Sequence, residues 1–367
     1  MTNSIKKKLQ SIIKKIAHLL FFFIYGRIKG VIDCKKHQSV EVCKVNIDGK
    51  NLYNLFKIKN CRVYTDTVTD TAFIIHNQII EGPSFQHRAV KNSDITDNIV
   101  FKKGTPRIKK KLKGSTLSLL TGGGGNSNYW HWLFDVLPRI KLIEKNINLN
   151  DIDFFLFPDI NEKFQIETLD LLKIINKKRL SSKKVRHFET DLAISVDHPY
   201  VIKNDPSIEI QNMPNWIIEF LKQKFLKFKS SKIFPKKIYI DRKDAKSNHS
   251  HLRKIINEDE VKEFLVKNGF EIFTLGEMSF IDQISLFNNA SQIIGLHGAG
   301  FANLIFCRPE THILELKPFT AGPVCGNLAK NNNLNYNDIS IKPSGNSNSD
   351  QQGHIIIPLN LLEKKII

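Results

Sequence analysis

The chain lacks the features that mark several common classes of protein. Its five cysteines are odd in number and include no Cys-x-x-Cys pair, so we expect reduced thiols in a cytoplasmic protein rather than a disulfide framework. It has no zinc-ligand spacing, RNA-binding aromatic box or internal repeat. The net charge of +19 follows from a composition crowded with Lys, Asn and Ile, and we predict no nucleic-acid partner.

Two phosphate and metal motifs are missing as well. Gly122–Gly125 is not followed by Gly-Lys-Ser/Thr, so it is no Walker motif and we expect a flexible loop there. No Asp-x-Asp pair has a convincing setting, because Asp151-Ile-Asp153 merely begins a predicted strand. We therefore expect no metal and no other cofactor.

No long hydrophobic run is present either. Residues 1–30 contain the apolar run Ile16–Tyr25, which is ten residues long, whereas a membrane-spanning helix needs ~20. Lysines precede this run at positions 6–8, 14 and 15. We expect a basic amphipathic helix on the anionic inner face of the plasma membrane. Two interpretations stay open: a signal peptide, although no clean cleavage site follows, and a helix docked on the N-terminal domain.

The stretch Ser291–Phe306 organises the second half of the chain. It begins with an apolar pair typical of a buried strand, and apolar residues at helical spacing follow the turn. A strand, a glycine-rich turn and a helix together bind phosphate, because the backbone approaches closely and the helix N-terminus offers free N–H groups. We therefore predict a nucleotide site at the turn Gly295-Leu-His297-Gly298-Ala299-Gly300.

Two polar residues sharpen this prediction. Glu315 stands near the end of the next predicted strand, where nucleotide-binding folds use an acidic residue to bind ribose hydroxyls. His297 beside the turn suits a reaction in which a diphosphate leaves, whereas a core histidine bonded to a carbonyl is the structural alternative. Arg242 and Arg253 are the expected diphosphate clamps, because a guanidinium binds phosphate oxygens with two bonds at once.

Alternating strands and helices predict an α/β protein of two domains. We place the first domain at residues 45–228 and the second at 233–343, with a loose segment and a terminal helix at 344–367. In the second domain, strands and helices alternate from Lys237 onward, which indicates a parallel, Rossmann-like sheet. Asn257 and Glu260 have the spacing of a capping box at a helix start.

Several ordered motifs carry a resemblance to a known family. They are Asn126–Arg139, Tyr239–Asp244, Arg253–Glu260, Phe280–Phe287, His297–Asn303 and Glu315. Together they resemble the family 61 glycosyltransferases over roughly residues 115–320, about half of the chain. That family includes bacterial capsule and lipopolysaccharide enzymes, plant xylosyltransferases and animal O-linked N-acetylglucosamine transferases.

The resemblance implies a GT-B-like fold, with two Rossmann-like domains facing each other across a cleft. It also implies a nucleotide-sugar donor and inversion at the anomeric carbon. The expected acceptor is a hydroxyl of a cell-envelope polysaccharide or of a lipid-linked glycan, on the side of residues 45–228. The expected donor-binding residues are Arg242, Lys243, Arg253, Asn257, His297, Gly298, Ala299, Gly300, Asn303 and Glu315.

His131 and Asp135 are the candidate catalytic pair. They lie four residues apart on the predicted helix Trp130–Leu137 and so share one face. Glycosyl transfer requires a base that takes the acceptor proton. We favour Asp135 as that base, with His131 as its neighbour or as an acceptor-binding group. The structural alternative pairs Asp135 with Arg139 and packs His131 among tryptophans.

Two other functions stay open at this point. A nucleotide-dependent oxidoreductase could use the same turn, but Gly-x-x-Gly-x-Gly reverses the usual dinucleotide spacing. A non-catalytic polysaccharide-assembly protein would be expected to have lost the base and the clamp residues, and both sets are present here.

Overall fold

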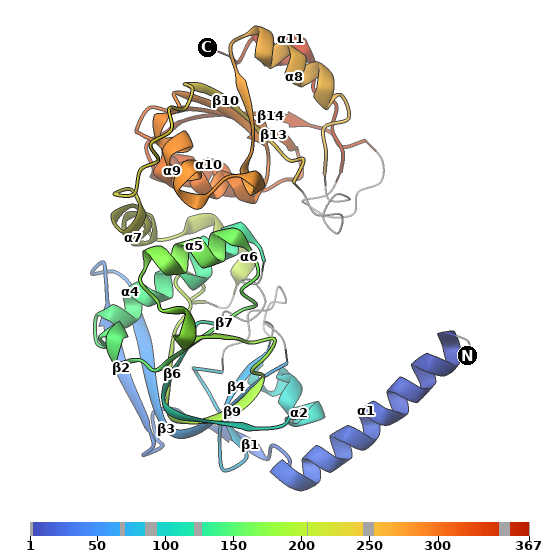
Figure 1. Cartoon of the computed structure of the whole chain (residues 1–367), viewed down its shortest axis with the longest axis vertical. Helices are drawn as coiled ribbons and strands as arrows, with labels where there is room; N and C mark the ends of the chain where they lie inside the picture. The colour runs from blue at the N-terminus through green and yellow to red at the C-terminus, as the bar shows by residue number, and fades with distance from the viewer. Residues whose placement is uncertain are drawn as a thin grey trace. The chain divides into compact units, whose positions relative to one another are not determined.

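The computed structural model of the chain describes residues 3–66, 70–84, 94–120, 127–203, 205–244, 253–344 and 353–366. They form two compact units that both mix strands and helices (Figure 1), so the chain is an α/β protein. Unit 1 comprises residues 1–161 and 173–207, and unit 2 comprises 162–172 and 208–367. Helices α5 (Lys163–Leu171) and α7 (Asn215–Phe225) thus belong to unit 2, although the sequence placed both in the first domain.

Unit 1 is built on a nine-stranded mixed sheet of order β1-β5-β4-β3-β9-β6-β7-β8, with β2 also paired to β3. The pairs of β9, β6, β7 and β8 are parallel, whereas β2, β3, β4, β5 and β9 form antiparallel pairs. The strands are β1 (Gly30–Ile32), β2 (Val40–Asn46), β3 (Leu52–Thr65), β4 (Thr71–Ile75), β5 (Gln78–Ile80), β6 (Lys110–Ser118), β7 (Phe154–Phe157), β8 (Arg179–Ser181) and β9 (His187–Val196).

This sheet differs from the parallel, Rossmann-like sheet that the resemblance implied for both domains. Between β2 and β5 the connections are too short for crossover helices, so these strands turn back on one another as hairpins. The described helices of the unit are α1 (Asn3–Tyr25), α2 (Ile99–Lys103), α3 (Tyr129–His131) and α4 (Pro138–Glu144), and α6 (Pro206–Glu209) crosses the boundary to unit 2. The shorter helical turns of unit 1 are η1 (Ile95–Asp97), η2 (Trp132–Val136), η3 (Leu149–Asp151) and η4 (Asn176–Lys178).

A buried arginine ties the helices of unit 1 to the sheet. Arg139 on α4 donates to the backbone oxygens of Leu120, just past β6, at 2.5 Å, and of Val196, at the end of β9, at 2.6 Å. Because both carbonyls lie past the last residues that pair β6 with β9, Leu117 and Ile194, Arg139 satisfies them in the interior. It thereby fixes the segment after β9 beside the helix that precedes α4.

Unit 2 contains a five-stranded, entirely parallel sheet of order β11-β10-β12-β13-β14. Its strands are β10 (Lys237–Asp241), β11 (Glu271–Thr274), β12 (Gln292–Leu296), β13 (His312–Pro318) and β14 (Asn335–Ile341). All of β12 is buried, which is typical of a central parallel strand covered on both faces. The Rossmann-like sheet predicted for the second half of the chain is therefore present.

Helices cover both faces of this sheet (Figure 1). Helices α8 (Glu258–Lys267) and α11 (Leu359–Glu363) lie on one face, where Val261, Leu265 and Leu362 join the apolar core. Helices α9 (Phe280–Asn289) and α10 (Val324–Asn331) lie on the other, with the 3₁₀ segment η7 (Ala299–Phe306). The remaining short turns are η5 (Ile210–Asn212) and η6 (Leu275–Glu277).

The strand order of unit 2 defines where a ligand is expected. The chain leaves β10 toward β11 on one side and then continues through β12, β13 and β14 on the other. Open α/β sheets bind ligands beyond the carboxyl ends of the two strands at such a reversal. Here those strands are β10, followed by Arg242, and β12, followed by His297.

Among the residues that the structure describes, helix α1 contacts unit 1 through its last turn, at Phe22 and Tyr25. Most of its described side chains, including Ile5, Ile12 and Ile16, are exposed. The described part of unit 1 therefore covers little of α1 outside its last turn. Within the described part of the chain, no helix has the length and apolar character that crossing a bilayer requires.

Candidate functional site

The fully buried carboxylate of Asp135 in unit 1 has three polar aromatic side chains around it. Asp135 Oδ2 lies 2.8 Å from His131 Nδ1, and Tyr200 Oη donates to Asp135 Oδ1 at 2.6 Å. The ring of His198 places its Nε2 3.7 Å from Asp135 Oδ2. Since His198 Nδ1 accepts the backbone N–H groups of Tyr200 and Val201, its Nε2 carries the hydrogen and faces the carboxylate.

His131 and Asp135 lie where the helix changes from an α-helical to a π-helical turn. Asn128 caps the first turn, because its side chain accepts the N–H groups of Trp130 and His131. The next turn, η2, is π-helical, and the N–H of Leu137 bonds to the carbonyl of Trp132. Single π-helical turns within helices occur frequently at functional sites. The expected helix over Trp130–Leu137 is thus divided into α3 and η2, and α4 begins directly after it at Pro138.

The protonation states of the pair follow from its contacts. Burial alone would raise the pKa of the Asp135 carboxyl, but His131 and His198 outweigh this and hold that pKa well below its usual range. Burial opposes the charged imidazole of His131, yet Asp135 raises the pKa of His131 above its ordinary value. Asp135 is therefore an anion that accepts hydrogen bonds. His131 is a stronger base than an ordinary histidine because its pKa is raised.

Asp135 and His131 differ in how much of each side chain is exposed to solvent. The Asp135 side chain is 0% exposed, whereas 25% of the His131 side chain is exposed. With Nδ1 donating to Asp135, the second nitrogen of His131, Nε2, carries the lone pair that can accept a proton. The alternative pairing of Asp135 with Arg139 is wrong, since the Arg139 guanidinium bonds to carbonyls of Leu120 and Val196.

The sequence analysis missed His198 and Tyr200. Both follow the buried strand β9, in the segment Asp197-His198-Pro199-Tyr200. Polar aromatic residues just past a buried strand were the available signal, because the carboxyl edge of parallel strands collects functional groups. Their partner could not be read from the sequence, since 65 residues separate Tyr200 from Asp135.

In unit 2, two guanidinium groups converge beyond the ends of β10 and β12. Arg253 Nε donates to the carbonyl of His297 at 2.7 Å, and Arg242 Nη1 donates to the same oxygen at 3.2 Å. Burial, together with the nearby charge of Arg242, lowers the pKa of Arg253 to about 10. Two like charges held together favour an anion such as a diphosphate, because a bound anion relieves their repulsion.

The glycine turn lies directly against these arginines. A Cβ at Gly298 would stand 3.4 Å from the Arg242 guanidinium carbon, and one at Gly300 would come within 2.9 Å of Leu275 Cδ1. The distance at Gly298 is an ordinary contact, so that position places the turn against Arg242, whereas a side chain at Gly300 would force Leu275 to move. Ala299 begins η7, whose first N–H groups lack partners within the helix and add to the positive character of the turn.

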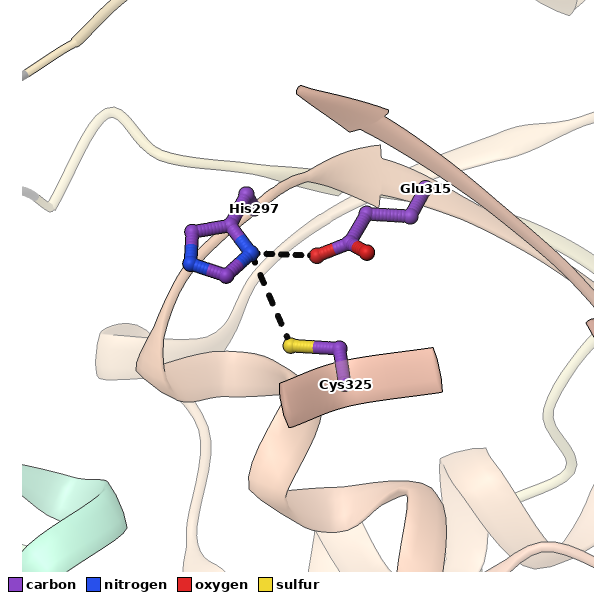
Figure 2. A group of neighbouring side chains, drawn as sticks. All are labelled: His297, Glu315 and Cys325. Carbon is purple, nitrogen blue, oxygen red and sulfur yellow. Dashed lines mark hydrogen bonds and ion pairs between the residues drawn. The ribbon is translucent and has the colours of Figure 1, made fainter. Parts of the chain in front are cut away.

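His297 is held by a buried network (Figure 2). Its Nδ1 is hydrogen-bonded to Glu315 Oε1, and Tyr336 Oη donates to Glu315 Oε2. Cys325 on α10 places its Sγ 3.7 Å from His297 Nδ1. Glu315 is 0% exposed, so its carboxylate faces His297 and Tyr336 in the interior. In this arrangement Glu315 orients the imidazole of His297; its expected contact with a ribose remains a prediction.

The same network contains nitrogen, sulfur and oxygen atoms that could hold a metal ion. The ligand atoms of His297, Glu315 and Cys325 lie within 4.8 Å of one another, and zinc accepts such donors. However, burial raises the pKa of the Cys325 thiol well above its usual value, as does Glu315. Lys317 Nζ also lies 3.9 Å from Glu315 Oε2. Without a metal ion these groups form a hydrogen-bonded cluster, whereas a bound metal would deprotonate the thiol and use the same residues as ligands.

The other predicted donor-side residues lie in different surroundings. Lys243 is exposed just past β10. Asn303 is buried and donates to Gln283 Oε1 at 2.9 Å. Asn257 exchanges two hydrogen bonds with the backbone of Ile357 at 2.9 Å, and its side chain makes no capping bond to α8, so the capping-box prediction is wrong. Asn257 therefore fixes the C-terminal segment to unit 2.

The fold and these two clusters define an α/β protein with a basic site suited to a nucleotide and a buried His–Asp pair. A sequence model of the glycosyltransferase 61 family matches residues 129–314, just over half of the chain. The chain therefore belongs to the glycosyltransferase 61 family, as the resemblance indicated. No curated protein matches the chain significantly.

The family match bears on the choice between a glycosyltransferase and an oxidoreductase, which the sequence left open. Family membership supports a glycosyltransferase, whereas nothing in the match favours an oxidoreductase. The matched residues begin at Tyr129, just before His131, and end at Leu314, next to Glu315. They thus include both clusters except for Glu315 and the residues that follow it.

Proposed function

We propose that this protein is an inverting, metal-independent glycosyltransferase that moves a sugar from a nucleotide-sugar to a hydroxyl group. Unit 2 is assigned as the donor-binding domain of a GT-B-like enzyme and unit 1 as its acceptor-side domain. The proposed acceptor is a cell-envelope polysaccharide or a lipid-linked glycan. That acceptor class rests on the capsule and lipopolysaccharide enzymes of the family.

The donor assignment rests on the paired arginines. Transfer breaks the bond between the anomeric carbon and the diphosphate, and the departing oxygen takes the bonding electrons. Arg242, Arg253 and the N–H groups of the turn at Gly298 supply positive charge where this negative charge develops. Binding that strengthens as the bond breaks accelerates the reaction.

The acceptor assignment rests on His131. Its Nε2 takes the proton of the acceptor hydroxyl as the acceptor oxygen forms its bond to the anomeric carbon. Asp135 keeps the hydrogen of the imidazole on Nδ1 and stabilises the imidazolium that results. The base in this proposal is therefore His131, and the role we favoured for Asp135 from the sequence becomes one of orientation.

The observation that carries the proposal is the pair of guanidinium groups bonded to one carbonyl at the strand reversal of unit 2. A panel of nucleoside diphosphates should therefore include one that raises the thermal unfolding temperature. A ligand at a hundredfold excess over its Kd adds about 2.7 kcal/mol to the free energy of unfolding. If no nucleoside diphosphate or nucleotide-sugar stabilised the protein, the donor site would lie elsewhere or be absent.

Metal independence is a separate prediction. Because guanidinium groups and backbone N–H groups can stabilise the leaving diphosphate, turnover should survive EDTA unchanged. Metal analysis of the purified protein provides the control. Loss of turnover on chelation with recovery on adding Mn²⁺ or Mg²⁺ would contradict the prediction, and stoichiometric zinc would assign the His297–Glu315–Cys325 cluster to a metal instead.

A further inference from the structure

Helix α1 presents a continuous apolar face that the described part of unit 1 leaves uncovered. The exposed residues recur every three or four positions, so they lie on one side of the helix. Nine large apolar side chains are between 47% and 90% exposed: Ile5, Leu9, Ile12, Ile13, Ile16, Leu19, Leu20, Phe23 and Ile24. Burying such a surface away from water is strongly favourable, so this face is suited to an apolar environment.

The opposite side of α1 is polar and basic. Lys7, Ser11, Lys14 and His18 follow one another along it, and Lys8 and Lys15 border the apolar face. The helix contains no acidic residue. Long lysine side chains at the border can extend their charges toward phosphate groups while their stems remain on apolar surface.

Two binding partners would fit the apolar face of α1, a second copy of the helix or a lipid surface, and the positions of the lysines distinguish between them. The spacing of residues 5, 9, 12, 16, 19 and 23 would also suit pairing with a second copy of the helix. However, such pairing would bring lysines against lysines at the flanking positions, with no glutamate or aspartate to complement them. An anionic lipid surface complements both the apolar face and the basic border.

The last turn of α1 is held by unit 1. The carbonyl of Tyr25 accepts Arg62 Nη1 at 3.1 Å, and the Tyr25 hydroxyl accepts the N–H of Lys109 at 3.0 Å. The Tyr25 ring meets His187 edge-on at 4.8 Å. Phe22 packs on Gly104, where a Cβ would come within 2.7 Å of the ring. Whatever binds α1 is therefore linked to unit 1 through a packed contact.

We propose that α1 docks in the plane of an anionic lipid bilayer, with its apolar face in the acyl region and its lysines among the headgroups. The docked helix holds unit 1 at the membrane surface. This inference does not depend on the transferase activity, and binding to vesicles tests it without a donor or an acceptor.

The test is co-sedimentation of the full chain with sucrose-loaded vesicles of phosphatidylcholine containing about 30% phosphatidylglycerol, whose anionic headgroups give the negative surface potential that attracts lysines. Pure phosphatidylcholine vesicles are the comparison. The triple variant Ile12→Gln/Ile16→Gln/Phe23→Gln should reduce partitioning more than about tenfold, because each change removes apolar surface. Lys14→Gln/Lys15→Gln should weaken binding to the anionic vesicles about five-fold per lysine at low salt, and not at high salt.

The matched control is Gln10→Ala/Ser11→Ala, which changes two exposed residues outside the apolar face and leaves the charge unchanged. It should bind vesicles like the unaltered protein. The proposal is overturned if the unaltered protein binds neither vesicle type, or if the glutamine triple variant binds as well as the control. It is also overturned if sedimentation velocity shows a dimer that the triple variant dissociates while vesicle binding is absent, since a second copy would then occupy the face.

Discussion

Replacing His131 with alanine should lower kcat by about 10²- to 10⁴-fold, because the acceptor hydroxyl would lose the group that takes its proton. Donor binding should remain intact, since the residues assigned to it belong to the other unit. Steady-state kinetics with the nucleotide-sugar identified by thermal stabilisation, together with calorimetry of its diphosphate, measure the two effects separately. Normal turnover of this variant would remove His131 from the mechanism.

Asp135→Asn tests how the base is supported. The change preserves the shape of the side chain but removes the charge that raises the pKa of His131. We expect kcat to fall about 10²-fold or more. The acid limb of kcat/KM should also move to lower pH, because His131 must be neutral to accept a proton and its pKa falls without the carboxylate.

Tyr200→Phe is the matched control for this pair. It removes one hydrogen bond to Asp135 Oδ1 while keeping the ring that packs edge-on against His198. The less stabilised carboxylate should attract a proton on His131 more strongly, so the acid limb should move to higher pH. Shifts in opposite directions for the two variants would not arise from a merely structural role. If Asp135→Asn alone lost turnover and His131→Ala did not, Asp135 would be the base.

The second large effect is expected at the paired arginines. Arg253→Ala should weaken nucleoside diphosphate binding roughly 100-fold, because a guanidinium forms two charge-assisted hydrogen bonds to phosphate. Arg253→Lys retains the charge but cannot form two hydrogen bonds to one phosphate in the geometry of a guanidinium, so it should give an intermediate Kd. Lys243→Ala removes the same charge from an exposed side chain nearby, so it should change the Kd by less than about five-fold.

His297 and Glu315 belong to the same experiment. His297→Ala should weaken diphosphate binding as measured by calorimetry. Glu315→Gln should weaken binding of the diphosphate but not of the nucleoside, if Glu315 acts by orienting His297. Loss of nucleoside binding as well would support the ribose contact expected from the sequence. Unchanged diphosphate affinity in the Arg253 and His297 variants would remove both residues from the donor site.

Local sequence was sufficient to predict most of unit 2. Continuous apolar runs predicted β10 and β12, because strands buried on both faces of a parallel sheet need apolar side chains in succession. The helix start at Asn257 predicted α8, and the glycine turn after β12 predicted a site at His297. These features depend on neighbours within a few residues, so a single sequence contains them.

Other features depended on contacts between distant parts of the chain. The mixed sheet of unit 1 follows from β3, which pairs with both β4 and β9, and nothing near β3 in the sequence indicates the second partner. The role of Asn257 likewise depends on Ile357, which is 100 residues away. Capping was the reasonable local expectation, but the C-terminal segment competes for the same amide.

The sequence by itself determined the family, the α/β class, the glycine turn and the candidate pair His131 and Asp135. Only the tertiary structure decided which residue of that pair is buried. The spacing of His131 and Asp135 predicts that they share a helix face, but it does not indicate which of them is exposed. Burial of Asp135 depends on Tyr200 and His198, which arrive from the end of β9 and surround the carboxylate. This difference in exposure is why we propose His131 as the proton acceptor, because a base must reach its substrate.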